Sequence, residues 1–359
     1  MVVNNFNKSI AVLCNYRLDT NRIGGMDYFF WEFDNACKIN NYQITWFFPN
    51  QAEHGLYPNM NIITVAEGDS IENCFLNNIK QYHFDYVITH FLELCTPFFK
   101  KVKLLKTAKI IAVDHNPRPL GGYSLRKKMK KVVYSLLFGR FIDLFVAVSD
   151  QTRNDLHNDF PFIPKLKTLT IYNGLPVNNI KVKDNKIKSK IYFMVCSHLR
   201  IEKGVKDIIE AVNKLSRGLH SKMIIDIYGD GPEMENLNNL IIKYKLQEVI
   251  FMKGSSDKTH KLYSKYDYLV HPSHSETFCY TVVESLLANV PVITTENAGN
   301  ILGLVSKKNG FIYPIGDITQ LSKQIKNILN EKVLLINTRE EIEEKFSIEN
   351  MVKNYISIL

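Results

Sequence analysis

Short apolar runs alternate with stretches of helical periodicity along the whole chain, and they fall into two series. Runs that are apolar throughout are typical of strands buried on both faces, as in parallel sheets that lie between layers of helices. Two such series therefore predict an α/β fold with two doubly wound domains. The first series comprises residues 9–16, 43–48, 85–91, 108–114, 144–149 and 169–173, and the second 190–197, 222–229, 248–254, 267–273 and 290–295.

The length of the chain agrees with this division, because 359 residues suit two domains of about 150 to 200 residues each. Between the two series lies a polar, charged stretch without periodicity. We expect a first domain over residues 1–176, a linker over 177–189 and a second domain over 190–342. The remaining residues, 343–359, are expected to form a helix that packs back on the first domain.

Composition excludes several classes of protein. No apolar run reaches about 18 residues, so we expect no transmembrane helix. The N-terminal residues lack the basic start, apolar core and cleavage site of a signal peptide. The six cysteines are scattered and form no Cys-x-x-Cys pair, which favours reduced thiols and a cytoplasmic location over disulfides or a structural zinc site.

Two glutamates stand out in the segment SHSETFCYTVVESLLANVPVI, which is otherwise largely apolar. Glu276 follows the run 267–273, and Glu284 lies eight residues later, inside a helix expected to begin near Cys279 or Tyr280. A helix N-terminus presents unpaired N–H groups and a partial positive charge, so the amides of Phe278, Cys279 and Tyr280 suit an anion. A nucleotide sugar matches this layout, because its diphosphate lies between sugar hydroxyls and ribose hydroxyls.

The segment ETFCYTVVE resembles the E-x7-E motif of the retaining family 4 glycosyltransferases, whose two-domain fold is called GT-B. Further segments match this family in its order along nearly the whole chain. They are IGGMDYFFWEF (23–33), AVDHNPRP (112–119), VAVSDQTRNDL (146–156), IYNGLP (171–176), SHLRIEKGVKDIIEA (197–211), IYGDGPEMENL (227–237) and NGFIYPIGD (309–317).

The resemblance implies roles for individual residues. Glu276 would bind hydroxyls of the donor sugar, Glu284 the ribose hydroxyls, and Lys203 the diphosphate. Gly24 and Gly25 would let the backbone approach the donor phosphate. His115 would lie at the reacting face, in the cleft between the domains where such enzymes bind their substrates.

Two positions depart from the family pattern. The family usually has an arginine five residues before Lys203, where this chain has His198, and Arg200 would replace that charge only if the loop bends differently. Either Lys203 and backbone amides hold the diphosphate, or protonated His198 contributes. Cys279 stands where glycine is common. We interpret Cys279 as a packed residue rather than a catalytic one, because the sequence shows no histidine placed to activate its thiol.

Positive charge is concentrated in one region. Between Thr96 and Ile142 twelve Lys or Arg residues face one acid, Asp114, whereas the whole chain carries +9. Residues 123–142 read as an amphipathic helix with a basic end, which suits docking on anionic lipid. An ordinary surface helix is the alternative. Its basic residues are Arg126, Lys127, Lys128, Lys130 and Lys131.

We therefore expect a retaining hexosyltransferase that uses a nucleotide diphosphate sugar, with UDP-sugars favoured. No cofactor or metal is expected, because no Asp-x-Asp motif is placed for a divalent cation. The expected acceptor is a hydroxyl of a lipid-linked or surface glycan in polysaccharide biosynthesis, at the inner face of the cytoplasmic membrane. The alternatives are a nucleotide-sugar epimerase of the same fold and a basic nucleic-acid-binding protein; nucleic acid is disfavoured, since no recognition motif is present.

Overall fold

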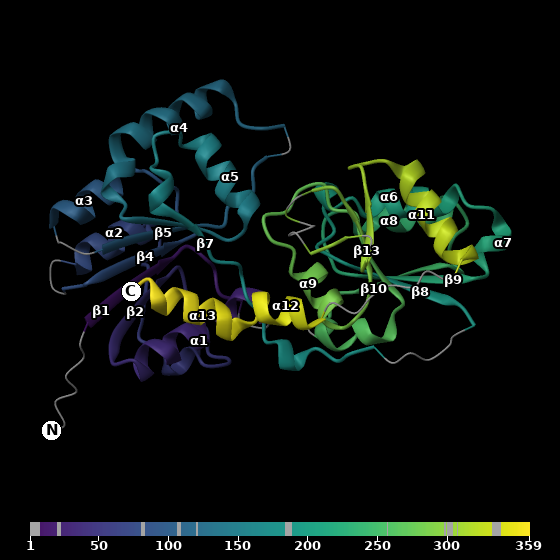
Figure 1. The fold of residues 1–359 in the computed structure, drawn as a ribbon, viewed down its shortest axis with the longest axis horizontal. Coiled ribbons are helices and arrows are strands. Elements are labelled where there is room, and N and C mark those ends of the chain that lie inside the picture. The colour runs from purple at the N-terminus through teal and green to yellow at the C-terminus, as the bar shows by residue number, and fades with distance from the viewer. Residues whose placement is uncertain are drawn as a thin grey trace. The chain divides into compact units, whose positions relative to one another are not determined.

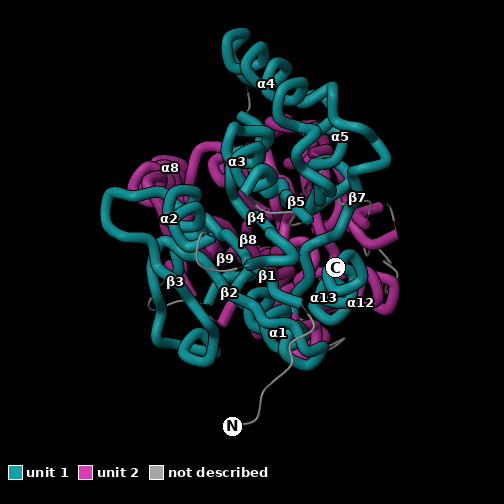
Figure 2. Tube along the Cα trace, turned by 90° about the vertical axis from the view of Figure 1, so that its left-hand side faces the viewer, with its two compact units in different colours: residues 1–175, 348–359 teal, residues 176–347 magenta. Residues whose placement is uncertain are grey.

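The computed structural model describes residues 8–19, 23–79, 83–105, 109–119, 121–183, 189–256, 258–297, 299, 304–306, 308–331 and 339–359. The chain divides into two compact units (Figure 2). Unit 1 comprises Met1–Leu175 and Ile348–Leu359, and unit 2 comprises Pro176–Ser347.

Unit 1 contains a seven-stranded sheet in the order β3-β2-β1-β4-β5-β6-β7, in which every pair of neighbours is parallel. The inner strands are apolar and buried, as expected for a sheet covered on both faces. The strands are β1 (Lys8–Cys14), β2 (Tyr42–Phe48), β3 (Ile62–Thr64), β4 (Tyr86–His90), β5 (Lys109–Asp114), β6 (Leu144–Ala147) and β7 (Thr168–Thr170).

Helices cover both faces of this sheet (Figure 1). Residues of α2 (Ile71–Asn78), α3 (Pro97–Leu105) and α5 (Asp150–Asp159) share one apolar core with alternate residues of the strands. The basic helix α4 (Leu125–Phe138) lies on the same side of the sheet. Serine side chains begin three of these helices, since Ser70, Ser124 and Ser149 each accept a hydrogen bond from an amide of the first turn.

The opposite face of the sheet carries α1 (Gly25–Ile39) and α13 (Ile348–Ser357), which lie side by side (Figure 1). The Tyr355 ring on α13 lies 4.8 Å from the Phe29 ring on α1. Leu175 O, at the end of the first part of unit 1, accepts a hydrogen bond from Ile348 N. The last helix of the chain is therefore part of the core of unit 1.

Unit 2 contains a six-stranded parallel sheet in the order β10-β9-β8-β11-β12-β13. In this order β8 and β11 are neighbours, although the two βα units that contain β9 and β10 lie between them in the sequence. The strands are β8 (Ile191–Cys196), β9 (Met223–Tyr228), β10 (Ile250–Gly254), β11 (Tyr268–His271), β12 (Val292–Thr295) and β13 (Gly310–Tyr313).

Helices also cover the sheet of unit 2. Side chains of α6 (Val205–Asn213), α8 (Met234–Lys243) and α11 (Ile318–Asn330) share one core with the strands, and the short α7 (Arg217–His220) lies at its edge. On the other face, α9 (Tyr280–Leu287) contacts α12 (Arg339–Phe346) (Figure 1). The prediction of two doubly wound parallel-sheet domains is confirmed.

Two details differ from the expectations. The segment 343–359 is not one helix, because α12 ends at Phe346 in unit 2 and α13 begins at Ile348 in unit 1. The edge strands β3 and β13 were absent from the predicted series. Part of the expected linker, 184–188, lies outside the described residues.

Candidate active site

Two loops of unit 2 bring Lys203 and Glu276 together. Lys203 ends a short 3-10 helix, Ile201–Lys203, after β8, and Glu276 lies in the loop after β11. Because β8 and β11 are hydrogen-bonded neighbours, their carboxyl ends deliver both loops to one place. Lys203 Nζ lies 2.5 Å from Glu276 Oε1, and both side chains are mostly covered, at 21% and 16% exposed.

The geometry of the Lys203 loop depends on a glycine. Gly204 has φ = 63°, and a Cβ there would lie 2.3 Å from Pro272 O and 2.9 Å from His274 Nε2. Glu202 O accepts a hydrogen bond from His274 N at 2.8 Å. A larger residue at 204 would therefore separate the two loops that carry Lys203 and Glu276.

The electrostatics keep Glu276 ionised. Burial alone would raise the pKa of this carboxyl, but the hydrogen bond and charge of His271, together with the charge of Lys203, outweigh burial and lower it. His271 Nε2 lies 3.4 Å from Glu276 Oε1. Asn297 Oδ1 accepts from Glu276 N at 3.4 Å, which helps to fix the loop.

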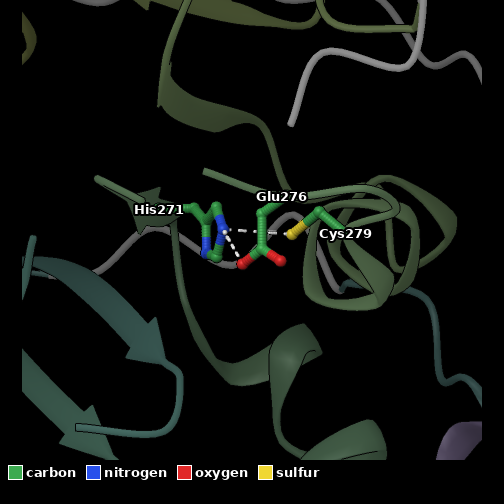
Figure 3. Close-up of side chains that lie close together, drawn as sticks. All are labelled: His271, Glu276 and Cys279. Carbon is green, nitrogen blue, oxygen red and sulfur yellow. Dashed lines mark hydrogen bonds and ion pairs between the residues drawn. The ribbon is translucent and has the colours of Figure 1, made fainter. Parts of the chain in front are cut away.

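His271 also contacts Cys279, and this corrects the expectation that no histidine stands beside that thiol (Figure 3). Cys279 Sγ lies 3.1 Å from His271 Nε2, and both residues are buried. Burial would lower the pKa of His271, but the Cys279 sulfur and the Glu276 carboxylate raise it to about 10. His271 is the last residue of β11, so the eight-residue spacing to Cys279 spans one loop from strand end to helix start.

His271, Glu276 and Cys279 are also the one group of described residues with the ligand types and spacing to hold a metal ion. One ligand atom from each lies within 4.8 Å of the others (Figure 3). Imidazole, thiolate and carboxylate together suit Zn²⁺ rather than Mg²⁺. The Lys203 ammonium already occupies the Glu276 Oε1 atom that such an ion would need.

Glu284 has different surroundings. It lies in α9, half-buried, and its Oε2 accepts a hydrogen bond from the Tyr263 hydroxyl at 2.7 Å. Burial raises the pKa of Glu284 to about 7, although the Tyr263 hydrogen bond opposes the rise. Tyr263 was missed in the sequence, because it lies in a short 3-10 turn without any motif.

The start of α9 is as predicted. The helix begins at Tyr280, and Cys279 is its N-cap residue; within the described residues its side chain makes no capping hydrogen bond to a first-turn amide. The ring of Phe278 packs 4.9 Å from that of Tyr280 and 5.8 Å from that of Phe346. Amides at this helix start therefore lie in the same loop as Glu276.

The two predicted substitutes for the family arginine lie elsewhere in the loop. Arg200 is 56% exposed and lies 3.9 Å from Glu202 Oε1, and His198 is exposed. Among the described residues, no ion pair or hydrogen bond joins either side chain to Lys203 or Glu276. The cationic side chains beside Glu276 are Lys203 and His271.

In unit 1, Gly24 is the N-cap of α1 and Gly25 its first residue. Gly24 N donates to Asp27 Oδ2 at 2.6 Å, and a Cβ at Gly24 would lie 2.6 Å from the Tyr16 hydroxyl. The buried Asp27 also accepts a hydrogen bond from Tyr57. Asp27 was not among the predicted site residues, although an acid in the third position of a helix is a common capping signal.

His115 directly follows β5 and is 6% exposed. Its Nε2 lies 2.9 Å from Nδ1 of His90, the last residue of the neighbouring strand β4. The Phe91 ring stacks on His115 with centroids 4.1 Å apart. Burial lowers the pKa of His90 to about 3, and burial together with His90 lowers the pKa of His115 well below its ordinary value, so both imidazoles are neutral.

Two family models match the chain, and together they span residues 72–346. The model described as "Glycosyl transferases group 1" matches residues 177–346, and "Glycosyltransferase Family 4" matches residues 72–179. The first match contains Lys203, Glu276 and Glu284, and the second contains His115.

Related proteins are less than 30% identical to this chain over the aligned segments. The N-acetyl-alpha-D-glucosaminyl L-malate synthase of Bacillus anthracis is 24% identical over 60% of this chain and 59% of its own length. The O-antigen biosynthesis glycosyltransferase WclY of Escherichia coli is 29% identical over 52% of this chain and 54% of its own. The chain thus matches less than two thirds of the length of these relatives. An uncharacterized glycosyltransferase of Methanocaldococcus jannaschii, MJ1069, is 24% identical over 94% of both chains.

Solved structures share the fold over nearly the full length. A glycosyltransferase from Rickettsia africae has a TM-score of 0.79 at 18% identity, and the match covers 98% of both chains. HepE of Anabaena, solved in complex with UDP, has a TM-score of 0.78 at 15% identity over 98% of this chain and 99% of its own. The family models and this fold together show that the chain belongs to the group 1 and family 4 glycosyltransferases of the GT-B fold.

Proposed function

We propose that this chain transfers a sugar from a UDP-sugar to a hydroxyl of a glycan acceptor, with retention at the anomeric carbon. The observation that carries the proposal is the Lys203–Glu276 contact beside the start of α9, with Glu284 farther along the same helix. HepE of Anabaena has been solved with UDP-glucose, which supports the uridine donor.

In this proposal the donor replaces the contact between Lys203 and Glu276. The diphosphate takes the Lys203 ammonium and the amides at the start of α9, and Glu276 then accepts hydrogen bonds from the hydroxyls of the sugar. His271 adds a second positive charge beside Glu276. The Lys203 ammonium attracts the doubly charged diphosphate and stabilises it further as a leaving group.

Glu284 is proposed to bind the ribose hydroxyls, and the Tyr263 hydroxyl positions its carboxylate. His115, Gly24 and Gly25 are proposed to act in the same reaction, as the resemblance implies. The departing phosphate deprotonates the acceptor hydroxyl on the same face of the sugar, so no protein nucleophile is required. We propose that no metal or cofactor takes part, because Lys203 supplies the positive charge that a divalent cation supplies in other transferases.

We propose a surface glycan or its lipid-linked precursor as the acceptor, made at the inner face of the cytoplasmic membrane. The names of two relatives support this class, since WclY is an O-antigen enzyme and CapM of Staphylococcus aureus a capsular polysaccharide enzyme.

The experiment is a screen of UDP-sugars for binding by calorimetry, followed by product analysis with and without an acceptor. We expect one UDP-sugar to bind and to be hydrolysed slowly to UDP and free sugar of the same anomeric configuration. Conversion to an epimeric nucleotide sugar without release of UDP would instead establish an epimerase. Absence of binding by every UDP-sugar would contradict the proposal.

A further inference from the structure

Helix α4 packs Tyr134 and Phe138 on the core of unit 1, but it presents most of its large apolar side chains to solvent. Six large apolar residues are exposed, from 37% for Val132 to 79% for Leu125. The residues that α4 buries are Lys131 and Ser135. An ordinary surface helix of a globular protein has the opposite arrangement. The exposed apolar residues are Leu125, Met129, Val132, Val133, Leu136 and Leu137, and we call them the α4 apolar face.

A buried polar network holds α4 in this orientation. Lys131 Nζ lies 3.1 Å from Asp159 Oδ2 on α5, and Arg118 Nε lies 3.0 Å from the same oxygen. The Lys131 ammonium also lies 4.3 Å from the centre of the Phe160 ring. Breaking such a buried pair leaves an uncompensated charge, so rotation of α4 about its axis is strongly opposed. The outward position of the apolar face is therefore built into unit 1.

Positive charges border the apolar face. Successive residues of an α-helix are turned by 100° about its axis. On this basis Arg126 and Lys130 lie along one edge of the α4 apolar face, and Lys128 lies along the other edge. No acidic residue occurs in α4. Among the described residues, Lys130 pairs with Glu93 at 3.4 Å, whereas no ion pair is found for Arg126, Lys127 or Lys128. The helix lies at the periphery of unit 1 (Figure 2).

We propose that the α4 apolar face, with Arg126 and Lys128 at its edges, docks on a lipid bilayer that contains anionic headgroups. An apolar stripe bordered by cations is the arrangement of helices that lie in the membrane interface. The long stems of lysine and arginine keep their charges at headgroup level while the stripe enters the acyl region. None of the described helices is long and apolar enough to cross a membrane, so attachment through α4 would be peripheral.

Two other occupants fit the face less well. A second copy of the chain in a two-fold interface would bring the same cations of both copies near one another, which is repulsive. Nucleic acid would use the cations through its phosphates, but it offers no apolar surface for the six exposed side chains. An anionic bilayer offers acyl chains to the exposed apolar side chains and negative charge to the cations. The inference deepens the proposed function, because a lipid-linked acceptor would lie in the same membrane.

The test measures binding of the whole chain to vesicles made of equal parts phosphatidylglycerol and phosphatidylcholine, and to vesicles of phosphatidylcholine alone. We expect co-sedimentation with the anionic vesicles. Reversal of Arg126 and Lys128 to glutamate should weaken binding at least about 25-fold, since each basic residue near an anionic surface contributes roughly a fivefold factor. Acids in the first turn of α4 favour the helix, so this variant should fold.

A matched control separates local from overall charge. Lys323 and Lys326 are exposed and lie in unit 2, and their reversal to glutamate changes the net charge equally. This control should keep most of the binding. A second variant, Met129→Gln with Leu136→Gln, retains every charge and should also weaken binding. In the variant Met129→Trp, fluorescence should shift to the blue on vesicle addition, against the buried background of Trp31 and Trp46.

The inference would be overturned if the chain did not bind anionic vesicles, or if the control variant lost as much binding as the test variant. An unshifted fluorescence spectrum of Met129→Trp would also overturn it. So would a dimer that the Gln variant dissociates, or tighter binding to duplex nucleic acid than to vesicles. Titration of the same preparation with UDP-glucose keeps the two proposals apart. Donor binding without vesicle binding rejects the docking surface alone, and vesicle binding without binding of any UDP-sugar rejects the proposed function alone.

Discussion

Lys203 Nζ lies 2.5 Å from Glu276 Oε1, although 73 residues separate the two in the sequence. Each side chain satisfies the charge of the other in the unliganded chain, at a place where both are mostly covered. A donor that takes the ammonium with its diphosphate releases the carboxylate for sugar hydroxyls. In the proposed function, the contact would therefore link recognition of the two parts of the donor.

The first prediction concerns this pair. Lys203→Ala and Glu276→Gln should each lower kcat/KM for transfer by about 100-fold or more, because each removes a charged group proposed to contact the donor. Thermal unfolding should show that both variants remain folded. Lys243→Ala and Glu235→Gln, at exposed positions of α8, are the matched controls and should keep wild-type rates. Full turnover by either site variant would refute the assigned roles.

The second prediction is a pH dependence that arises from Glu284. Its pKa of about 7 means that the carboxyl loses its proton between about pH 6 and pH 8. The ionised form accepts stronger hydrogen bonds from ribose hydroxyls, so UDP-glucose should bind roughly tenfold more tightly at the higher pH. Calorimetry on wild type and Glu284→Gln tests this, and the variant should show a flat profile. UDP-glucose is chosen because its diphosphate does not titrate in this range.

The third prediction concerns metals. Transfer should be unchanged after treatment with EDTA, because the Lys203 ammonium provides the charge at the diphosphate. Added Zn²⁺ should inhibit by binding His271, Glu276 and Cys279, whose ligand atoms lie within 4.8 Å of one another. Cys279→Ser should raise the inhibitory zinc concentration by at least about tenfold. Restoration of EDTA-treated enzyme by Mg²⁺ would contradict the metal-independent mechanism.

The fourth prediction follows from the buried pair His90 and His115. Both have lowered pKa values in the folded chain, so between their folded values and about 6.5 the unfolded chain binds more protons. The free energy of unfolding should therefore fall as the pH drops below about 6.5. His90→Asn should reduce this slope, measured by urea unfolding at several pH values. A titration of either imidazole near pH 6.5 in NMR spectra of the folded chain would contradict the prediction.

The fifth prediction concerns the core of unit 1. Tyr355 on α13 is fully buried against Phe29, and its hydroxyl has no hydrogen-bond partner among the described residues. Tyr355→Phe should thus leave the free energy of unfolding unchanged or raise it, whereas Tyr355→Ala should lower it by about 3–5 kcal/mol. Chemical denaturation measures both. A large loss in the Phe variant would mean that the hydroxyl is hydrogen-bonded after all.

Much of the fold was predictable because inner strands of a parallel sheet are continuous apolar runs. The run 108–114, for example, corresponds closely to β5 (Lys109–Asp114). The edge strands β3 and β13 were harder, since β3 has only two apolar residues, Ile62 and Ile63, and β13 begins with Gly310, which is typical of a turn. The loop containing Glu276 and the start of α9 at Tyr280 were also predictable, from the strand end and the helical pattern.

Contacts across the sheet could not be predicted from local patterns. His90 and His115 meet because β4 and β5 are adjacent, and His271 meets Cys279 because one loop folds back on the end of β11. The orientation of α4 was likewise hidden, since periodicity identifies an apolar face but not whether it points inward. A buried contact between Lys131 and Asp159 decides that question.

The return of α13 to unit 1 has a consequence for biosynthesis. The ribosome completes all of unit 2 before it delivers residues 348–359, so until then Phe29 on α1 lacks its contact with Tyr355 of α13. Chaperones and proteases would meet this incomplete core in any chain that stops early. A premature stop codon late in the message should therefore lead to degradation of the truncated protein, rather than to accumulation of a nearly full-length one.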